Sequence, residues 1–311
     1  MKKTIFILTL LLPICVLFAQ YNKSYVDTHG NSNSMSFVAQ ESANGGYNMS
    51  DVDQLQDGNR VNVAQVNTDP TTGSWWDRNN SDIYQDGVGN YAVVGQIHGT
   101  IADATADTPS GGLLDADIKQ LGDGNTAIVS QEGVNNFGTI RQNGNRGVAI
   151  QYQGKSWYFD AGTPTRYNDA YIWQGPNVDG GSRAEQYQEG TQNDAHIWQN
   201  SDNASKAVQI QVNDKPTYSY PIQDLNEAFI WQEDGGNNRA YQLQYYTDNG
   251  AERNYARVHQ TGSDNYSQQV QFGGDNKSIT NQTGGVNGVH VLQTSNGITT
   301  APFYPTLPVH Y

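Results

Sequence analysis

Glutamine recurs at a fixed interval of 11 residues in two parts of this chain. The two runs are Gln120, Gln131, Gln142 and Gln153, and Gln260, Gln271, Gln282 and Gln293. Each Gln closes a seven-residue phrase close to N-x-A-x-I-x-Q, which residues 193–199 show in full. Self-similarity at a fixed period indicates a repeat architecture, in which each unit buries its face only against its neighbours. We therefore expect function to arise from stacked units rather than from a single active site.

The phrase has the alternation of a β-strand. Positions 1, 3, 5 and 7 of a strand share one face, and in residues 193–199 that face carries Asn193, Ala195, Ile197 and Gln199. A helix is excluded because Gly and Asn interrupt every unit. The sequence predicts nineteen strands, at 34–40, 48–54, 59–65, 79–85, 90–96, 114–120, 125–131, 136–142, 147–153, 168–174, 182–188, 193–199, 205–211, 226–232, 238–244, 254–260, 265–271, 276–282 and 287–293.

The links between these strands alternate in length. The link after 48–54, and every second link from there, has four to seven residues and often holds a Gly-containing turn, whereas the other links reach seventeen residues. The long insertions are 66–78, 97–113, 154–167, 212–225 and 245–253. Two strands per coil explain this alternation, because all long insertions then leave along one edge. We count about nine coils, from 48–65 to 276–293, after an unpaired strand at 34–40.

Position 5 of the phrase separates the same two classes of strand. One class carries Ile or Val there, at Val52, Ile83, Ile118, Ile140, Ile172, Ile197, Ile230 and Val258. The alternate class mixes Val with Gln, at Gln151, Gln186, Gln209, Gln242 and Gln269. Two unrelated features thus agree on a coil of two strands.

Stacking would bring like residues of successive coils within roughly 4.8 Å of one another. Inward Gln and Asn side chains would then form amide ladders, each donating to one neighbour and accepting from the next. An isolated buried amide would instead cost about 1–3 kcal/mol. The predicted fold is an all-β solenoid with cross-β Gln/Asn ladders. The predicted ladder residues are Asn90, Gln85, Gln96, Gln120, Asn125, Gln131, Gln142, Gln153, Gln174, Gln188, Asn193, Gln199, Gln232, Gln260, Asn265, Gln271, Asn276, Gln282, Asn287 and Gln293.

The first nineteen residues predict an export signal. Lys2 and Lys3 precede an apolar run over 5–12, and Ala19 lies before Gln20, which is the pattern of a Sec-type signal peptide. The single cysteine, Cys15, falls inside this segment, so the exported chain would have no disulfide. The formal net charge of −14 argues against nucleic acid as a partner.

The unit I-x-Q-x-G-x-x-N-x-A-x-x-x-Q occurs at 83–96 and again at 118–131, and it resembles the curlin repeat. The resemblance covers nearly all of 34–293. It implies a secreted, extracellular structural subunit of curli, the functional amyloid fibres of Gram-negative biofilms, and a role in biofilm matrix and cell adhesion. The implied partners are further copies of the chain, an outer-membrane secretion channel, curli accessory proteins and a nucleating subunit.

The signal-peptide pattern, the repeats and, for the leader, the resemblance divide the chain into segments. Residues 1–19 are the expected signal peptide, 20–33 a leader segment that addresses the channel, 34–293 the repeat solenoid, and 294–311 a tail with Pro and aromatic residues that is a candidate cap. The chain has more repeats than the five that are usual in the family, and long insertions interrupt one edge. A main subunit and a minor, nucleating subunit therefore both remain open.

No pattern typical of an enzyme is present. The histidines His29, His98, His196, His259, His290 and His310 lack metal-ligand spacing. Nucleophile elbows, phosphate loops and zinc patterns are also absent from the sequence. The sequence therefore predicts no catalytic, cofactor-binding or metal site.

Outward positions form rows in three successive strands of one class. Position 6 carries Trp173, Trp198 and Trp231, position 4 carries Tyr171, His196 and Phe229, and position 2 carries Asp169, Asp194 and Glu227. The aromatic rows either stabilise the sheet or form a candidate adhesive strip of Trp173, Trp198, Trp231, Tyr171 and Phe229. In the second case the chain is a non-polymerising β-solenoid adhesin that binds extracellular polysaccharide. The acidic row repels itself, and we expect protonation to relieve that repulsion.

Overall fold

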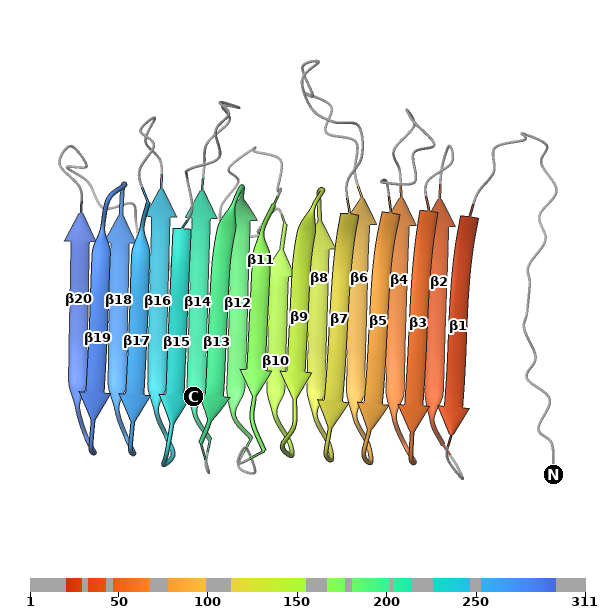
Figure 1. Cartoon of the computed structure of the whole chain (residues 1–311), viewed down its shortest axis with the longest axis horizontal. Helices are drawn as coiled ribbons and strands as arrows, with labels where there is room; N and C mark the ends of the chain where they lie inside the picture. Colours follow the sequence, from red (N-terminus) through yellow and green to blue (C-terminus); the bar gives the residue numbers. More distant parts are fainter. Residues whose placement is uncertain are drawn as a thin grey trace, which may run out of the picture.

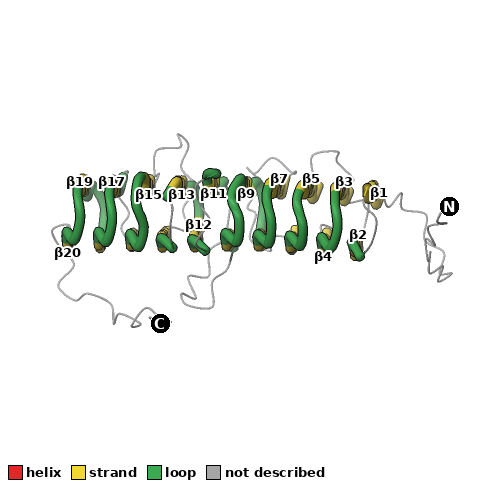
Figure 2. The backbone as a smooth tube through the Cα atoms, turned by 90° about the horizontal axis from the view of Figure 1, so that it is seen from below, coloured by secondary structure: helices red, strands yellow, loops and turns green. Residues whose placement is uncertain are grey.

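Two flat parallel β-sheets lie face to face along the whole described part of the chain (Figures 1 and 2). The computed structural model describes residues 21–29, 33–42, 47–67, 78–98, 113–154, 167–176, 181–201, 204–213, 226–246 and 253–294. These residues form twenty strands, ten in each sheet. They include no helix, and hence none that could cross a membrane.

The odd-numbered strands make one sheet, called sheet A, and the even-numbered strands make sheet B. Sheet A consists of β1 (Tyr21–His29), β3 (Tyr47–Leu55), β5 (Arg78–Asp86), β7 (Leu113–Leu121), β9 (Asn136–Gln142), β11 (Asp169–Gln174), β13 (Asn193–Asn200), β15 (Asn226–Glu233), β17 (Tyr255–Thr261) and β19 (Lys277–Thr283). Sheet B consists of β2 (Met35–Ser42), β4 (Arg60–Asn67), β6 (Tyr91–His98), β8 (Thr126–Glu132), β10 (Val148–Gln153), β12 (Arg183–Gly190), β14 (Lys206–Asn213), β16 (Arg239–Tyr246), β18 (Tyr266–Phe272) and β20 (Gly288–Thr294).

Each strand pairs in parallel with the strand two further along the chain, and the two sheets run in opposite directions (Figure 1). The register places like positions of the repeat on top of one another, as Ala195 on Ala228 and Gln199 on Gln232. Short turns join β3 to β4 and β5 to β6 at one edge, called the turn edge, and β4 ends opposite it at the loop edge (Figure 1). Two strands thus form one layer, and the layers repeat along the long axis.

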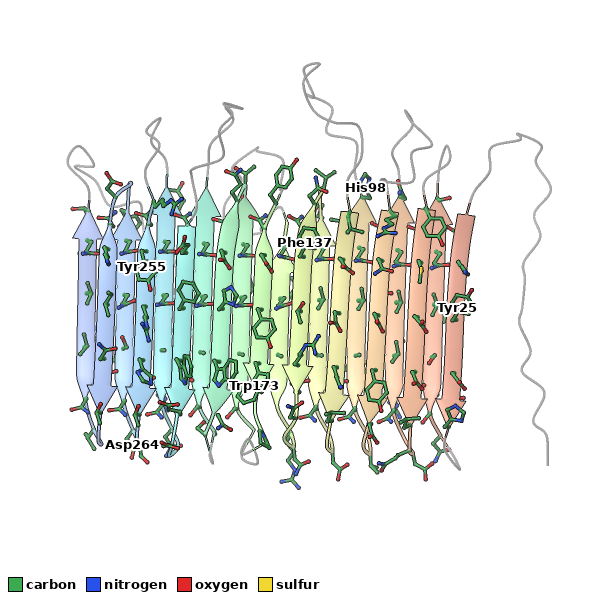
Figure 3. All side chains as sticks on the ribbon, in the orientation of Figure 1. Tyr25, His98, Phe137, Trp173, Tyr255 and Asp264 are labelled. Atoms are coloured by element: carbon green, nitrogen blue, oxygen red, sulfur yellow. The ribbon has the colours of Figure 1, made fainter. Side chains whose placement is uncertain are left out.

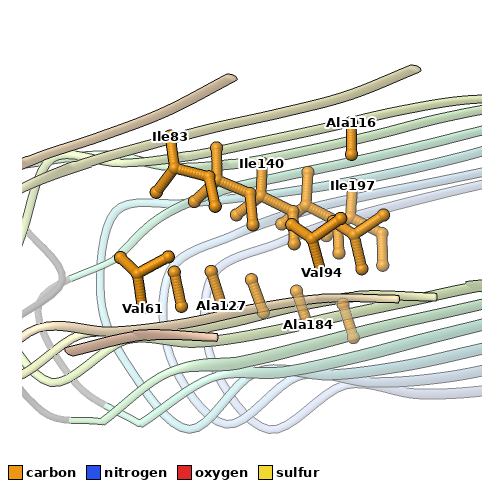
Figure 4. Close-up of a cluster of buried hydrophobic side chains, with 14 of the residues drawn as sticks. Val61, Ile83, Val94, Ala116, Ala127, Ile140, Ala184 and Ile197 are labelled. Atoms are coloured by element: carbon orange, nitrogen blue, oxygen red, sulfur yellow. The ribbon is translucent and has the colours of Figure 1, made fainter. Parts of the chain in front are cut away.

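The interior is narrow because a row of large residues in sheet A faces a row of small residues in sheet B. Ile83, Ile140 and Ile197 form one row along the axis, and Ala127 and Ala184 lie across from it (Figure 4). All five side chains are fully buried. Burial of an Ile stabilises a fold by about 1.5–3 kcal/mol, so this row is a principal source of apolar stability. The eight Ile and Val residues predicted at position 5 of this class are at most 1% exposed.

The turns stack as closely as the strands do. Gly122 N donates to Asp86 O at 2.9 Å, and Gly124 N donates to Val88 O at 2.9 Å, so each turn is bonded to the turn of the preceding layer. Gly87 adopts a φ of +132°, and a Cβ there would lie 2.0 Å from Gly122 O. Glycine is required at this point because backbone approaches backbone directly.

The predicted fold is confirmed: the described chain is an all-β, two-strand-per-layer solenoid, and all nineteen predicted strands are present. The structure adds a twentieth strand, β1, inside the segment that was expected to be a leader. The strand at 34–40, predicted to lack a partner, therefore forms a further layer with β1, and there are ten layers rather than about nine.

Several predicted segments lie outside the described residues. These are the signal peptide at 1–19, almost all of the tail at 294–311, and most of the long insertions. The strands that flank the insertions do end and begin at one common edge, as β4 and β5 or β6 and β7 show (Figure 1).

The close contact between turns gives a direct test. Gly87→Ala should lower the free energy of unfolding by about 1–3 kcal/mol more than Gly89→Ala, because overpacking against backbone adds to the cost of a positive φ. Gly89 is a matched control, since its φ is +71° and no atom lies within 4 Å of its Cβ position. Guanidinium unfolding of both variants at low concentration measures the difference. Equal losses would contradict the steric argument.

Candidate functional site

Two unbroken ladders of glutamine side chains run through the interior. In sheet A the ladder extends from Gln54 to Gln282, with Nε2–Oε1 distances of 2.7–2.9 Å. In sheet B it extends from Gln40 to Gln293, with distances of 2.7–3.0 Å. In every step Nε2 donates to Oε1 of the next layer toward the C-terminus. All fourteen Gln residues predicted for the ladders lie in these two rows.

The same amides also tie the two sheets together. Gln131 in sheet B donates to Gln153 in the next layer at 2.8 Å, and its Nε2 also donates to Asp115 O of sheet A at 2.8 Å. Each rung therefore joins neighbouring layers and facing sheets at once. This explains how fully buried amides are satisfied without water.

A third ladder occupies the later layers of sheet B. It consists of Gln151, Gln186, Gln209, Gln242 and Gln269, with distances of 2.9–3.1 Å, and it ends on Thr280 Oγ1 of sheet A at 2.8 Å. These residues were absent from the predicted ladder set. The signal was present in the sequence, because they stand at position 5, which shares the inward face with the predicted rungs.

The asparagines follow a different pattern. Asn276 Nδ2 donates to Asn254 Oδ1 at 3.1 Å and Asn287 Nδ2 donates to Asn265 Oδ1 at 2.8 Å, so these bonds point toward the N-terminus, against the glutamine ladders. Asn193 and Asn265 also donate to the preceding Asn of their sheets, at 3.0 and 3.1 Å.

Two of the asparagines predicted as ladder rungs donate hydrogen bonds to turn carbonyl groups instead. Asn90 Nδ2 donates to Gly122 O at 2.8 Å, and Asn125 Nδ2 donates to Gly144 O at 2.7 Å. Asn90 Oδ1 accepts from the backbone N of Asn125 at 2.9 Å. The shorter Asn side chain thus binds turn backbone in these layers, whereas amide-to-amide stacking had been expected.

The outward aromatic rows stack on themselves. The ring centroids of Trp173 and Trp198 lie 4.0 Å apart and those of Trp198 and Trp231 lie 5.3 Å apart, with interplanar angles of 31° and 25°. His196 stacks on Phe229 at 5.1 Å and lies 5.8 Å from Tyr171. Rows of like side chains cross the strands, and Trp173 lies on the outer face near the turn edge (Figure 3). Because the rings face their neighbours along the axis, mainly ring edges are turned to solvent.

The acidic row lies beside these rings on sheet A. Burial raises the pKa of Asp169, and the neighbouring Asp194 carboxylate raises it further. Burial alone would lower the pKa of His196, but the contact of its Nε2 with Asp194 Oδ1 at 2.7 Å outweighs this and the net pKa is raised. His196, expected to be a solvated outward histidine, is therefore half-buried in an acidic environment.

A second set of carboxylates occupies earlier layers of the same face. Asp82 stacks between Asp51 and Asp117 in the strand register. Burial raises its pKa, and the carboxylates of Asp117 and Asp51 contribute in the same direction. Within the described residues, no group of three or more His, Cys, Asp or Glu side chains is arranged to hold a metal ion.

In-register layers and continuous ladders define a repeat β-solenoid whose organisation is that of a structural protein. Residues 114–144, which run from β7 through β9, match the family model of the Curlin associated repeat. This match confirms the recognition of curlin repeats in that segment. No curated protein matches the chain. Repeat family and fold together point to a structural protein rather than an enzyme.

The ladder can be tested by removing one rung. Gln131→Leu should lower the free energy of unfolding by at least about 1–3 kcal/mol, because Gln153 Oε1 then loses its buried donor. Gln268→Leu is the matched control, since Gln268 lies on the outer face of sheet B and accepts from Tyr266 Oη at 3.3 Å. Chemical unfolding of both variants measures the difference. Similar losses would show that the rung contributes no more than an outer side chain.

The raised pKa values predict how stability depends on pH. For Asp82, Asp169 and His196 the folded state binds protons more tightly than the unfolded state. The free energy of unfolding should therefore be highest in acid and should fall as pH rises, above about pH 4 for the carboxyls and above about pH 6.5 for the imidazole. Glu233, whose pKa is lowered chiefly by a hydrogen bond from His259, acts in the opposite sense only below about pH 4.5.

The measurement is chemical unfolding at a series of pH values between about 4 and 8. Asp169→Asn should flatten the decline and stabilise the chain at neutral pH. Asp123→Asn, on an exposed turn away from both carboxylate sets, should leave the slope unchanged. A free energy of unfolding that rises steadily from pH 5 to 8 would contradict the interpretation.

Proposed function

We propose that this chain is a secreted structural subunit of a curli-like fibre, in which copies add end to end so that the layers continue from one copy to the next. The observation that carries the proposal is that, among the described residues, no strand pairs with the outer edge of the first layer, β1 and β2, or of the last layer, β19 and β20. Val26 in the first layer is 42% exposed, whereas Val52, at the same position one layer on, is fully buried. An unpaired strand edge is a template for another strand, and natural proteins normally cover or charge it.

The two ends also have complementary hydrogen-bonding groups. Within the chain, each Gln Nε2 donates toward the C-terminal side, so Gln293 in the last layer is placed to donate to Gln40 in the first layer of a following copy. The paired asparagines donate toward the N-terminal side, so Asn22 of the following copy is placed to donate to Asn276. The glutamine ladder of sheet B and the asparagine row of sheet A would thus pass through the junction without reversal.

The location and partners follow from the curlin resemblance. We expect export across the outer membrane of a Gram-negative bacterium through a secretion channel, with curli accessory proteins and a nucleating subunit. The segment 20–33 would direct the chain to the secretion channel before β1 joins the stack. The fibre would serve the biofilm matrix and cell adhesion, as the main subunit or as a minor, nucleating one.

The alternative is a non-polymerising adhesin that binds polysaccharide through the aromatic strip. Sugar rings stack on open aromatic faces, whereas Trp173, Trp198 and Trp231 turn their faces to one another. This geometry favours the structural role of the strip, in which each stacked pair contributes about 0.5–1.5 kcal/mol.

Electron microscopy tests the proposal. The chain from Gln20 onward, diluted from guanidinium to micromolar concentration, should form unbranched fibres within a day. Discrete particles that persist even when preformed fibre ends are added would overturn it.

A substitution at the open edge distinguishes end-to-end stacking from non-specific association. Val26→Lys should slow elongation about ten-fold or more, because a charge would be buried at each junction. Asp27→Lys is the matched control, since Asp27 is the next residue on the same strand and its side chain is 69% exposed. Elongation rates from seeded growth measure both effects, and equal rates for the two variants would exclude this end as the junction.

A further inference from the structure

The two outer faces carry opposite charges in the same three layers. On sheet A, the acidic row of Asp169, Asp194 and Glu227 follows the register of β11, β13 and β15. On sheet B, a basic row of Arg183, Lys206 and Arg239 follows the register of β12, β14 and β16. Both rows advance by one residue per layer, at roughly 4.8 Å. The two rows therefore have the same spacing on opposite sides of one molecule.

An apolar row accompanies each charged row. It lies on the same outer face, four residues further along each strand. Sheet A has the tryptophan row of Trp173, Trp198 and Trp231, and sheet B has an apolar row of Tyr187, Ile210 and Leu243. Trp231 is 40% exposed, and the other five side chains are half-buried. Each face thus offers one charged and one apolar row. Within the acidic row, Asp194 contacts His196 at 2.7 Å and Glu227 lies 3.8 Å from Arg253.

We propose that these faces bind one another, so that sheet A of one copy packs on sheet B of a second copy and ribbons stack side by side. The occupant of each face is a second copy of this chain, because the charge on one face complements the charge on the other. The flatness of both sheets allows contact over several layers (Figures 1 and 2). This lateral contact is separate from the end-to-end junction, and it does not require that junction to form.

The direction of the strands fixes how the ribbons lie. Position 2 is near the loop edge in sheet A and near the turn edge in sheet B, because the two sheets run in opposite directions (Figure 1). With parallel ribbon axes the acidic row would meet the apolar row, and carboxylates would be buried against apolar side chains. A half-turn about the normal to the face sets the acidic row on the basic row and the tryptophan row on the apolar row. The stacked ribbons are therefore antiparallel.

In this arrangement the layer of β13 and β14 in one copy lies over the same layer of the other copy. Asp194 then faces Lys206, Asp169 faces Arg239, and Glu227 faces Arg183. Glu185 lies beside the basic row, where Arg183 Nε and Tyr187 Oη both donate to its carboxylate. At positions 2, 4 and 6 of the phrase, which form the middle of each face, the strands from β7/β8 to β19/β20 bring no two like charges into opposition. Because the contact joins two different faces, it leaves a free face on each side, and stacks grow without closing.

Charge reversal and its rescue test the proposal. One variant carries Asp169→Lys, Asp194→Lys and Glu227→Lys, and the other carries Arg183→Glu, Lys206→Glu and Arg239→Glu. Each should give only single ribbons, since both of its faces then have the same sign. Fibres of the two variants, grown separately and then mixed in equal amounts, should stack again as the unchanged chain does. Ribbon stacks are counted by negative-stain microscopy and pelleted at low speed, at an ionic strength of about 0.15 M.

A third variant controls for the change in net charge. Asp123→Lys, Asp234→Lys and Asp264→Lys alter the charge by the same amount at exposed turns outside the strands, as Asp264 at the turn edge illustrates (Figure 3). This variant should stack like the unchanged chain. If the row variants stack alone, or if their mixture stays single, the lateral contact is wrong.

The same samples also separate this inference from the proposed fibre. If no fibres form, sedimentation velocity of the unassembled chains replaces microscopy. Paired species are then expected for the unchanged chain and for the mixture of row variants, and single chains for each row variant alone. A single species in all samples would overturn the lateral contact whatever the fate of the end-to-end proposal.

Discussion

The hydrogen bond between stacked primary amides is the interaction on which the rest of this structure depends. A Gln side chain has donors and an acceptor at its tip, and in the ladder it meets the next layer and the facing sheet together, as Gln131 does. A shift of one residue in any strand would turn its rungs to solvent and its charged residues inward. The ladders therefore fix the register of all ten layers, and the short turns and the narrow Ile and Ala interior follow from that register.

Most of the fold could be predicted because a period of 11 residues and a strict alternation leave few alternatives. β1 was missed because its phrase ends in Thr28 instead of Gln and lacks the central Ala. Its place in the sheet is set by pairing with β3, which no local pattern encodes. The same reasoning explains Asn90 and Asn125, whose partners are turn carbonyls of the next layer that only the folded backbone brings within reach.

The rows of side chains on the outer faces could be predicted from the sequence, but the orientation of their rings and the burial of their titratable groups could not. Strand spacing places Trp173, Trp198 and Trp231 in line, whereas the tilt of their rings depends on packing between layers. Likewise, the half-buried state of His196 arises from its neighbours Phe229 and Asp194 in three dimensions. The predicted rows belong to one outer face only, and the basic row on the other face becomes meaningful once both sheets are known to share the same layers.

The opposed directions of the glutamine and asparagine bonds have an electrostatic consequence. Aligned amide groups add their dipoles, as peptide units do in a helix, and a fibre with all its side-chain amides aligned would carry a partial charge at each tip and a dipole moment that grows with its length. The Asn rows, exemplified by Asn276 and Asn254, point against the Gln rows. They cancel part of this axial field, so that a long ribbon remains closer to electrically neutral end to end than its glutamines alone would allow.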